Sequence, residues 1–154
     1  MMNAAHLHII LNHFPIVGLV FSAIILTAAH LRRSEELARV GAACLIFLAV
    51  VSIAAYLTGK SAEEVVEHMP GISQNLVEAH AEAAFYALVL LELLGIIAAY
   101  GLFTSLPPKA VPRWLLPTLQ VLSLVAIIWV AWTSHLGGRI AHPEVRPGFE
   151  MVEL

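Results

Sequence analysis

The sequence predicts an all-α membrane protein, a transmembrane four-helix up-down bundle with a short outer surface helix. Of its 154 residues, 60% are apolar and only 12% are charged, which lies far outside the range of soluble domains. Four apolar stretches each approach the ~20 residues with which a helix crosses a bilayer. None of them shows the alternation of a barrel strand. We therefore expect one membrane domain over residues 1–154, with the lipid bilayer as its main partner.

The four apolar stretches define the expected spans, at about residues 9–29, 40–57, 80–104 and 114–135. The first stretch has neither the basic start nor the cleavage site of a signal peptide, so we expect it to stay in the protein. Short connections follow the first and the third span, which predicts antiparallel neighbours. Pro15 favours a first helix that begins at Asn12 or His13, with an extended segment before it.

The outer loop between the second and third spans, residues 58–79, has a pattern of its own. Ser61 and Glu64 have the spacing of a capping box, and a Pro-Gly pair follows them. We therefore expect a short surface helix over about Ala62–His68. Ser73 is the expected N-cap of the third long helix, which would then begin before the membrane.

Basic residues set the expected orientation, because Lys and Arg concentrate in the cytoplasmic loops of membrane proteins. The first and last connections carry five of the eight basic residues, namely Arg32, Arg33, Arg39, Lys109 and Arg113. These connections are expected in the cytoplasm. Both chain ends and the central loop then face the periplasm of a bacterial inner membrane.

Seven of the eight histidines fall on this outer side, and three of them mark the ends of different spans. His13 opens the first span, His80 opens the third and His135 closes the fourth. Ionisable groups at membrane depth mark functional sites, so we expect these three imidazoles to form one cofactor site. Two further candidates are His8, before the first span, and His142, which a break at Gly137-Gly138 would fold over the bundle mouth.

The residues around the histidines are compatible with two kinds of site. Haem needs two axial ligands and a slot, and the helical face below His80 continues as Ala84, Ala87, Leu91 and Ala98, three of which are small. A zinc or di-metal site would add carboxylates, and Glu78 and Glu82 flank His80. The expected metal set is therefore His13, His80, His135, Glu78 and Glu82.

Glu92 is a separate candidate site near the middle of the third span. A carboxyl group at that depth is expected to be protonated or hydrogen-bonded inside the bundle. It is a candidate for a proton path or a quinol pocket, and a satisfied core residue is the alternative.

The start of the chain carries a motif that resembles a known family. The segment His8-Ile-Ile-Leu-Asn-His13-Phe14-Pro15-Ile16 is similar to the His-Pro-x-x-x-His-Phe-Pro-Ile signature of the predicted bacterial membrane proteins grouped as domain-of-unknown-function family 2231. Ile9 stands where that family usually has Pro. Later pieces that also resemble the family pattern are Thr58-Gly59, His80, and Leu136-Gly137-Gly138 with His142. The resemblance implies four helices with positioned histidines, and such proteins are suspected of haem binding or electron transfer.

The leading functional expectation is a b-type cytochrome-like subunit that holds haem b near the periplasmic face by two of His13, His80 and His135. It would pass electrons between quinol and a periplasmic protein. One alternative is a protein that binds or transports zinc, copper or iron, and another is the non-catalytic membrane anchor of a periplasmic enzyme. A second copy of the chain is a further candidate partner.

Other classes of function fit the sequence poorly. The chain has no basic block of the kind that binds nucleic acid, and no nucleophile is paired with a base in a hydrolase motif. An electron-transfer or binding subunit is therefore expected rather than a stand-alone enzyme.

Overall fold

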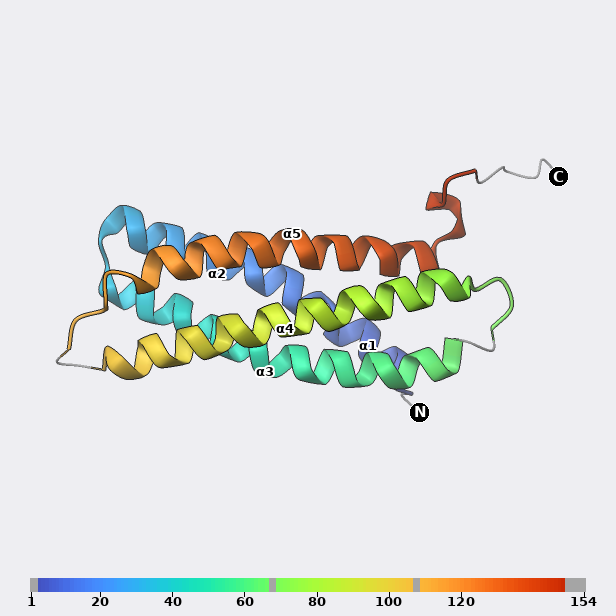
Figure 1. Cartoon of the computed structure of the whole chain (residues 1–154), viewed down its shortest axis with the longest axis horizontal. Coiled ribbons are helices and arrows are strands. Elements are labelled where there is room, and N and C mark those ends of the chain that lie inside the picture. Colours follow the sequence, from blue (N-terminus) through green and yellow to red (C-terminus); the bar gives the residue numbers. More distant parts are fainter. Residues whose placement is uncertain (1–2, 67–68, 107–108, 149–154) are drawn as a thin grey trace.

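The computed structural model of the chain describes residues 3–66, 69–106 and 109–148. Its elements are α1 (Ala4–Leu11), α2 (His13–Arg32), α3 (Glu35–Val66), α4 (Gln74–Thr104), α5 (Leu115–Ala141) and the short 3-10 helix η1 (Pro143–Val145). Helices α2 to α5 run antiparallel in sequence order (Figure 1). The predicted all-α up-down bundle is confirmed.

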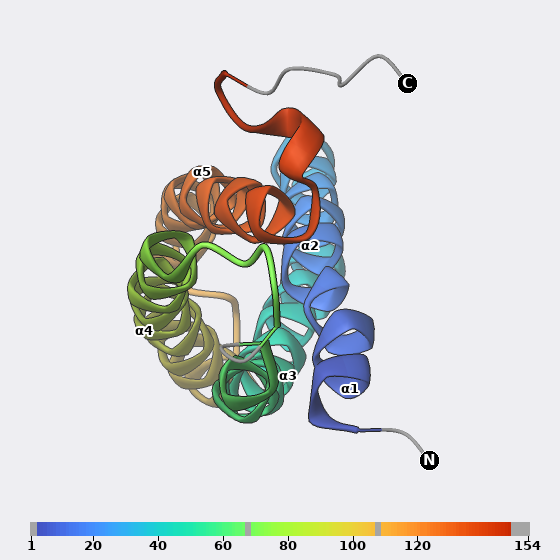
Figure 2. The ribbon, with the colours of Figure 1, turned by 90° about the vertical axis from the view of Figure 1, so that its right-hand side faces the viewer.

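The four long helices form a closed ring. Helix α2 packs against α3 and α5, and α4 packs against the same two helices, so α2 and α4 lie diagonally across the bundle (Figure 2). Helix α1 continues α2 and packs on α3. The starts of α1 and α4 and the ends of α3 and α5 lie together at one end of the bundle, which we call the termini end (Figure 1). The α2–α3 and α4–α5 connections lie at the opposite end, the hairpin end.

The outer surface of the bundle is apolar. Phe21, Phe47, Ile96 and Ile128 are all more than half exposed. Four helices, counting α1 and α2 as one, are long and apolar enough to cross a membrane. Because soluble monomers rarely expose apolar patches of such extent, this surface fits lipid, and the chain is a multi-pass membrane protein. At 1.5 Å per residue the 32 residues of α3 reach roughly 48 Å, so its ends project beyond a ~30 Å hydrocarbon core.

The expected extended segment before the first span is wrong. Residues 4–11 form α1, whose first turn is capped by the Asn3 side chain, which accepts a hydrogen bond from the His6 N–H at 2.9 Å. The break falls at Asn12, one of the two positions expected for the helix start. Pro15 explains the break, because it has no N–H to donate to the carbonyl of Leu11.

The separate surface helix over Ala62–His68 is also not formed. Residues 62–66 are the last turns of α3, which runs through the expected boundary, whereas His68 lies outside the described residues. The Thr58 hydroxyl donates within the helix to the Ala54 carbonyl at 2.8 Å. Ser61 likewise points back along the helix, with Oγ 3.5 Å from the Leu57 carbonyl. Neither side chain therefore stops α3.

The break expected at Gly137-Gly138 is absent, because α5 continues to Ala141. Arg146 then closes the end of this helix. Its Nε donates to the Arg139 carbonyl at 2.8 Å and its Nη2 donates to the Ile140 carbonyl at 3.0 Å. A guanidinium at a helix C-terminus satisfies carbonyls that lack a partner within the helix.

Small residues bring α3 and α4 close together at mid-bundle. A Cβ added at Gly95 would lie 2.4 Å from the Cβ of Ala49. We expect Gly95→Ala to lower the free energy of unfolding by about 1–2 kcal/mol, because the overlap outweighs the better helix propensity of Ala. Thermal unfolding in detergent, followed by circular dichroism, measures this.

Gly138→Ala is the matched control, since no atom of the described residues that belongs to a neighbouring element lies within 4 Å of its added Cβ. Exchanging the two residues, as Gly95→Ala with Ala49→Gly, is expected to recover most of the loss. A Gly95→Ala variant as stable as the parent protein would contradict this packing.

Candidate functional site

Two imidazoles meet at the termini end of the bundle. His8 lies on α1 and His80 lies in the second turn of α4. The two imidazoles therefore come from diagonally opposite sides of the bundle. Their centroids are 6.4 Å apart and their planes are inclined by 74°. Both side chains are half-buried. The structure thus pairs one residue from the expected histidine site, His80, with a further candidate, His8.

Each ring is fixed by a hydrogen bond to the backbone of the adjacent helix. The Nδ1 of His8 lies 2.9 Å from the Ala55 carbonyl of α3, and the Nδ1 of His80 lies 3.0 Å from the Thr133 carbonyl of α5. A carbonyl oxygen can only accept, so Nδ1 carries the proton in both rings.

The other ring nitrogen remains available. In a neutral imidazole with the proton on Nδ1, the Nε2 atom carries a lone pair. Within the described ranges, neither Nε2 has a hydrogen-bond partner in the protein. Metal-binding histidines have this arrangement, in which a backbone carbonyl holds one nitrogen and the other faces the metal. The two Nε2 lone pairs therefore suit a metal centre that is coordinated by two imidazole nitrogens.

A carboxylate also lies at this end of the bundle. Glu63, near the end of α3, interacts electrostatically with His80 and pairs with Lys60 at 3.8 Å. Arg139, in the last turns of α5, adds a positive charge at the same end of the bundle. Its Nε is buried and has no hydrogen-bond partner among the described residues.

The other histidines of the expected site are not brought to this pair. His13 is exposed, and its ring bonds the Ile9 carbonyl of the preceding turn at 2.7 Å. His135 is exposed, and its ring centroid lies 5.7 Å from that of Trp132. Both imidazoles therefore lie on the outer surface of the bundle.

His142 pairs with a residue of the tail. It lies just after α5 and is exposed, with Nδ1 2.9 Å from Glu144 Oε1. The pKa of the Glu144 carboxyl is lowered by a hydrogen bond with its own backbone N–H and then by the His142 ring. Because the expected break in α5 is absent, nothing folds His142 over the bundle mouth.

The expected metal set is not assembled in this conformation. Glu78 and Glu82 are exposed on α4. Over residues 3–66, 69–106 and 109–148, no three side chains of His, Cys, Asp or Glu lie together in a group that could hold a metal ion.

Glu92 is hydrogen-bonded at mid-bundle, well away from the imidazoles. Its Oε1 lies 3.1 Å from the Oγ of Ser52, a buried hydroxyl on α3 whose oxygen is also 2.8 Å from the Ala49 carbonyl. Twelve residues along α4 separate Glu92 from His80, roughly 18 Å of helix. The contact ties α3 to α4, and it does not belong to the imidazole pair.

The residues of α4 on the same face as His80 point to the interior of the bundle. Ala87, Leu91 and Ala98 are buried, and Ala84 is half-buried. The interior face of α4 therefore leads from His80 into the core.

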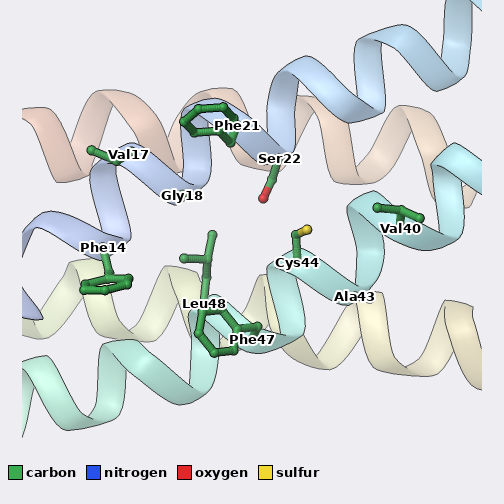
Figure 3. Close-up of a pocket in the computed structure, with 10 residues that line it drawn as sticks. All are labelled: Phe14, Val17, Gly18, Phe21, Ser22, Val40, Ala43, Cys44, Phe47 and Leu48. Atoms are coloured by element: carbon green, nitrogen blue, oxygen red, sulfur yellow. The ribbon is translucent and has the colours of Figure 1, made fainter.

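A groove of about 480 Å³ lies between α2 and α3 on the side of the bundle (Figure 3). Its lining is almost entirely apolar and includes Phe14, Phe21 and Phe47. The hydroxyl of Ser22 points into the space between the helices and has no hydrogen-bond partner in the described part of the chain. Neither imidazole of the pair lines this groove, so it is a separate, lipid-facing feature.

No family model, no curated protein and no solved structure matches the chain. The fold and the site themselves define its class, a four-helix membrane bundle with two paired imidazoles at its termini end.

The sequence does not indicate that His8 meets His80, because it predicts an extended segment before Asn12. In the structure, residues 4–11 form a helix that continues α2 toward the termini end and places His8 against α3. The signal was available in Asn3, which has the residue type and the position of an N-cap.

The hydrogen bonds predict the tautomers of the imidazoles. In protein labelled with ¹⁵N-histidine, we expect the neutral rings of His8 and His80 to carry their proton on Nδ1, because each Nδ1 faces a carbonyl. Nitrogen chemical shifts in magic-angle-spinning spectra distinguish the two tautomers, and His8→Ala and His80→Ala variants assign the signals. Each substitution should remove the Nδ1–H signal of the replaced histidine and leave that of the other, and finding the Nε2–H form at either position would contradict the geometry.

Proposed function

We propose that the protein is a membrane-embedded, b-type cytochrome-like electron-transfer subunit whose haem iron is ligated by His8 and His80. The observation that carries this proposal is the pair of Nδ1-bonded imidazoles. The two residues come from diagonal helices, and their ring centroids are 6.4 Å apart. Each Nδ1 atom bonds a carbonyl, which leaves both Nε2 atoms free.

The spacing and the number of ligands favour haem. A first-row metal ion lies about 2.1 Å from a ligating imidazole nitrogen, so two rings on opposite sides of one ion have centroids roughly 6 Å apart. Haem iron needs only two axial ligands from the protein, whereas a structural zinc ion takes four. The two imidazoles suffice for the first kind of site.

Charge and helix packing support the same ligand class. Haem carries carboxylates, and Arg139 offers a guanidinium whose Nε has no partner among the described residues. The interior face of α4 below His80 bears small side chains, Ala84 and Ala87, of the kind that leave room beside a ligand. Bound haem would supply one-electron chemistry. The imidazoles and the apolar bundle would set its potential through ligation and burial.

The position at the termini end suggests the partners. By the distribution of Lys and Arg this end faces the periplasm, so a periplasmic protein would exchange electrons there and quinol would approach from the lipid. The iron site then lies near the membrane surface, where a soluble partner can reach it.

Substitution of histidines tests the ligand assignment. We expect purified protein reconstituted with haem to show a Soret band and sharp reduced α and β bands, with one haem per chain by pyridine haemochrome assay. His8→Ala and His80→Ala should each lose low-spin haem, because each removes an axial ligand. His13→Ala and His135→Ala, which are exposed, serve as matched controls and should keep it.

Other outcomes would redirect the proposal. A colourless protein with stoichiometric zinc, copper or iron would favour the alternative of ion binding or transport. A colourless, metal-free protein that copurifies with a periplasmic enzyme would favour an anchor subunit. Loss of haem in His13→Ala or His135→Ala but not in His8→Ala would overturn the ligand pair.

Labelling of single cysteines tests the proposed orientation. In a Cys44→Ala background, Glu36→Cys at the hairpin end and Glu144→Cys at the termini end place exposed thiols on opposite sides of the bundle. A reagent that cannot cross the inner membrane is expected to label Glu144→Cys but not Glu36→Cys in cells with a permeabilised outer membrane. Lysed cells provide the control in which both react, and the reverse pattern in intact cells would invert the topology.

A further inference from the structure

Two glycines lie directly against the two imidazoles. A Cβ added at Gly59 on α3 would lie 2.9 Å from Cε1 and 3.1 Å from Nδ1 of His8. A Cβ added at Gly137 on α5 would lie 3.0 Å from Cε1 and 3.3 Å from Nδ1 of His80. Each ring therefore occupies the space that any other residue would fill with its side chain.

The two contacts follow the same pattern. The His8 ring rests on Gly59 and bonds the carbonyl of Ala55, and the His80 ring rests on Gly137 and bonds the carbonyl of Thr133. In each case the carbonyl lies four residues before the glycine, one helical turn earlier on the same face. In both contacts, the imidazole therefore packs across one turn of the neighbouring helix.

The pattern also repeats in the topology. The His8 ring extends from α1 and contacts α3, and the His80 ring extends from α4 and contacts α5. In the ring of helices, α1 with α2 stands opposite α4, and α3 stands opposite α5 (Figure 2). Each histidine-glycine contact therefore joins a helix that begins at the termini end to a helix that ends there, and the two contacts use opposite pairs of helices.

We propose that Gly59 and Gly137 are positioning residues, which hold the two imidazoles in equivalent orientations so that both Nε2 atoms serve one ligand between them. This inference rests on the proposed function for the identity of the ligand, haem. The positioning itself is a property of the protein alone. A larger residue at either glycine displaces the ring from its carbonyl and removes the restraint on tautomer and orientation.

Simple helix packing does not account for these glycines. Gly95, which does serve packing, faces the Cβ of Ala49 on the next helix, and Gly101 faces the side chain of Leu115. At Gly59 and Gly137 the three nearest atoms all belong to an imidazole ring.

The chain provides a matched control, because Gly138 is adjacent to Gly137 and, in the described part of the chain, no neighbouring element has an atom within 4 Å of an added Cβ there. Ala favours helix over Gly, so Gly138→Ala should keep or raise the Tm. Gly59→Ala and Gly137→Ala are expected to weaken haem binding about tenfold, the upper end of the scale for one hydrogen bond between neutral groups, and to add a high-spin fraction to the spectrum. Gly138→Ala should leave both unchanged.

A measurement without haem separates this inference from the proposed function. In apo-protein labelled with ¹⁵N-histidine, Gly59→Ala should alter the ring signals of His8 only, and Gly137→Ala those of His80 only. If these changes occur while the parent protein binds no haem, the positioning role stands and the choice of haem fails. If the parent protein binds haem and the ring signals and affinity of both variants match the parent, the positioning role is overturned.

A double substitution covers the case in which an alanine variant folds poorly. If the added Cβ meets only the imidazole, Gly137→Ala should lower the Tm in the parent protein but not in a His80→Ala background. The same cycle applies to Gly59→Ala with His8→Ala. An equal loss of Tm in both backgrounds would show that the glycine serves helix packing and would overturn the proposal.

Discussion

Main-chain carbonyls are the acceptors on which the polar contacts between the helices depend. In lipid, each helix must satisfy its own backbone hydrogen bonds, but every carbonyl keeps a second lone pair. His8, His80 and Trp129 each donate to a carbonyl of a neighbouring helix, with Trp129 reaching the Ala83 carbonyl at 3.0 Å. Such bonds add a directional contact between helices without burying a second polar side chain.

The same device fixes both ends of the bundle. At the hairpin end, Arg39 of α3 donates to the carbonyl of Ser105 at 3.2 Å and to that of Lys109 at 2.9 Å, and it pairs with Glu35 at 3.0 Å. It thereby attaches the α4–α5 connection to the start of α3. At the termini end the imidazoles do this between α1 and α3 and between α4 and α5. The carbonyl bonds that help to hold the helices thus also leave two ring nitrogens free for a ligand.

The mid-bundle contact between Ser52 and Glu92 is of a different kind, because it joins two side chains. It lies beside the close approach of Gly95 to Ala49, which brings α3 near enough to α4 for the bond to form. Removal of water strengthens this contact, and it also makes an unpaired carboxyl group there costly. The distance from the imidazole pair means that the two polar features act independently unless a proton or a quinol links them.

The sequence by itself determined the four helices, their antiparallel order and the gathering of histidines at one end. Helix length and apolar composition are local properties, and short connections leave little choice of neighbour. It could not determine which imidazoles meet, because that depends on the rotation of each helix about its axis and on the helical continuation before Asn12. Only the tertiary structure turned His13 and His135 outward and laid His8 and His80 across Gly59 and Gly137. Contacts between diagonal corners of a bundle arise from packing of all the helices together, and no spacing along the chain encodes them.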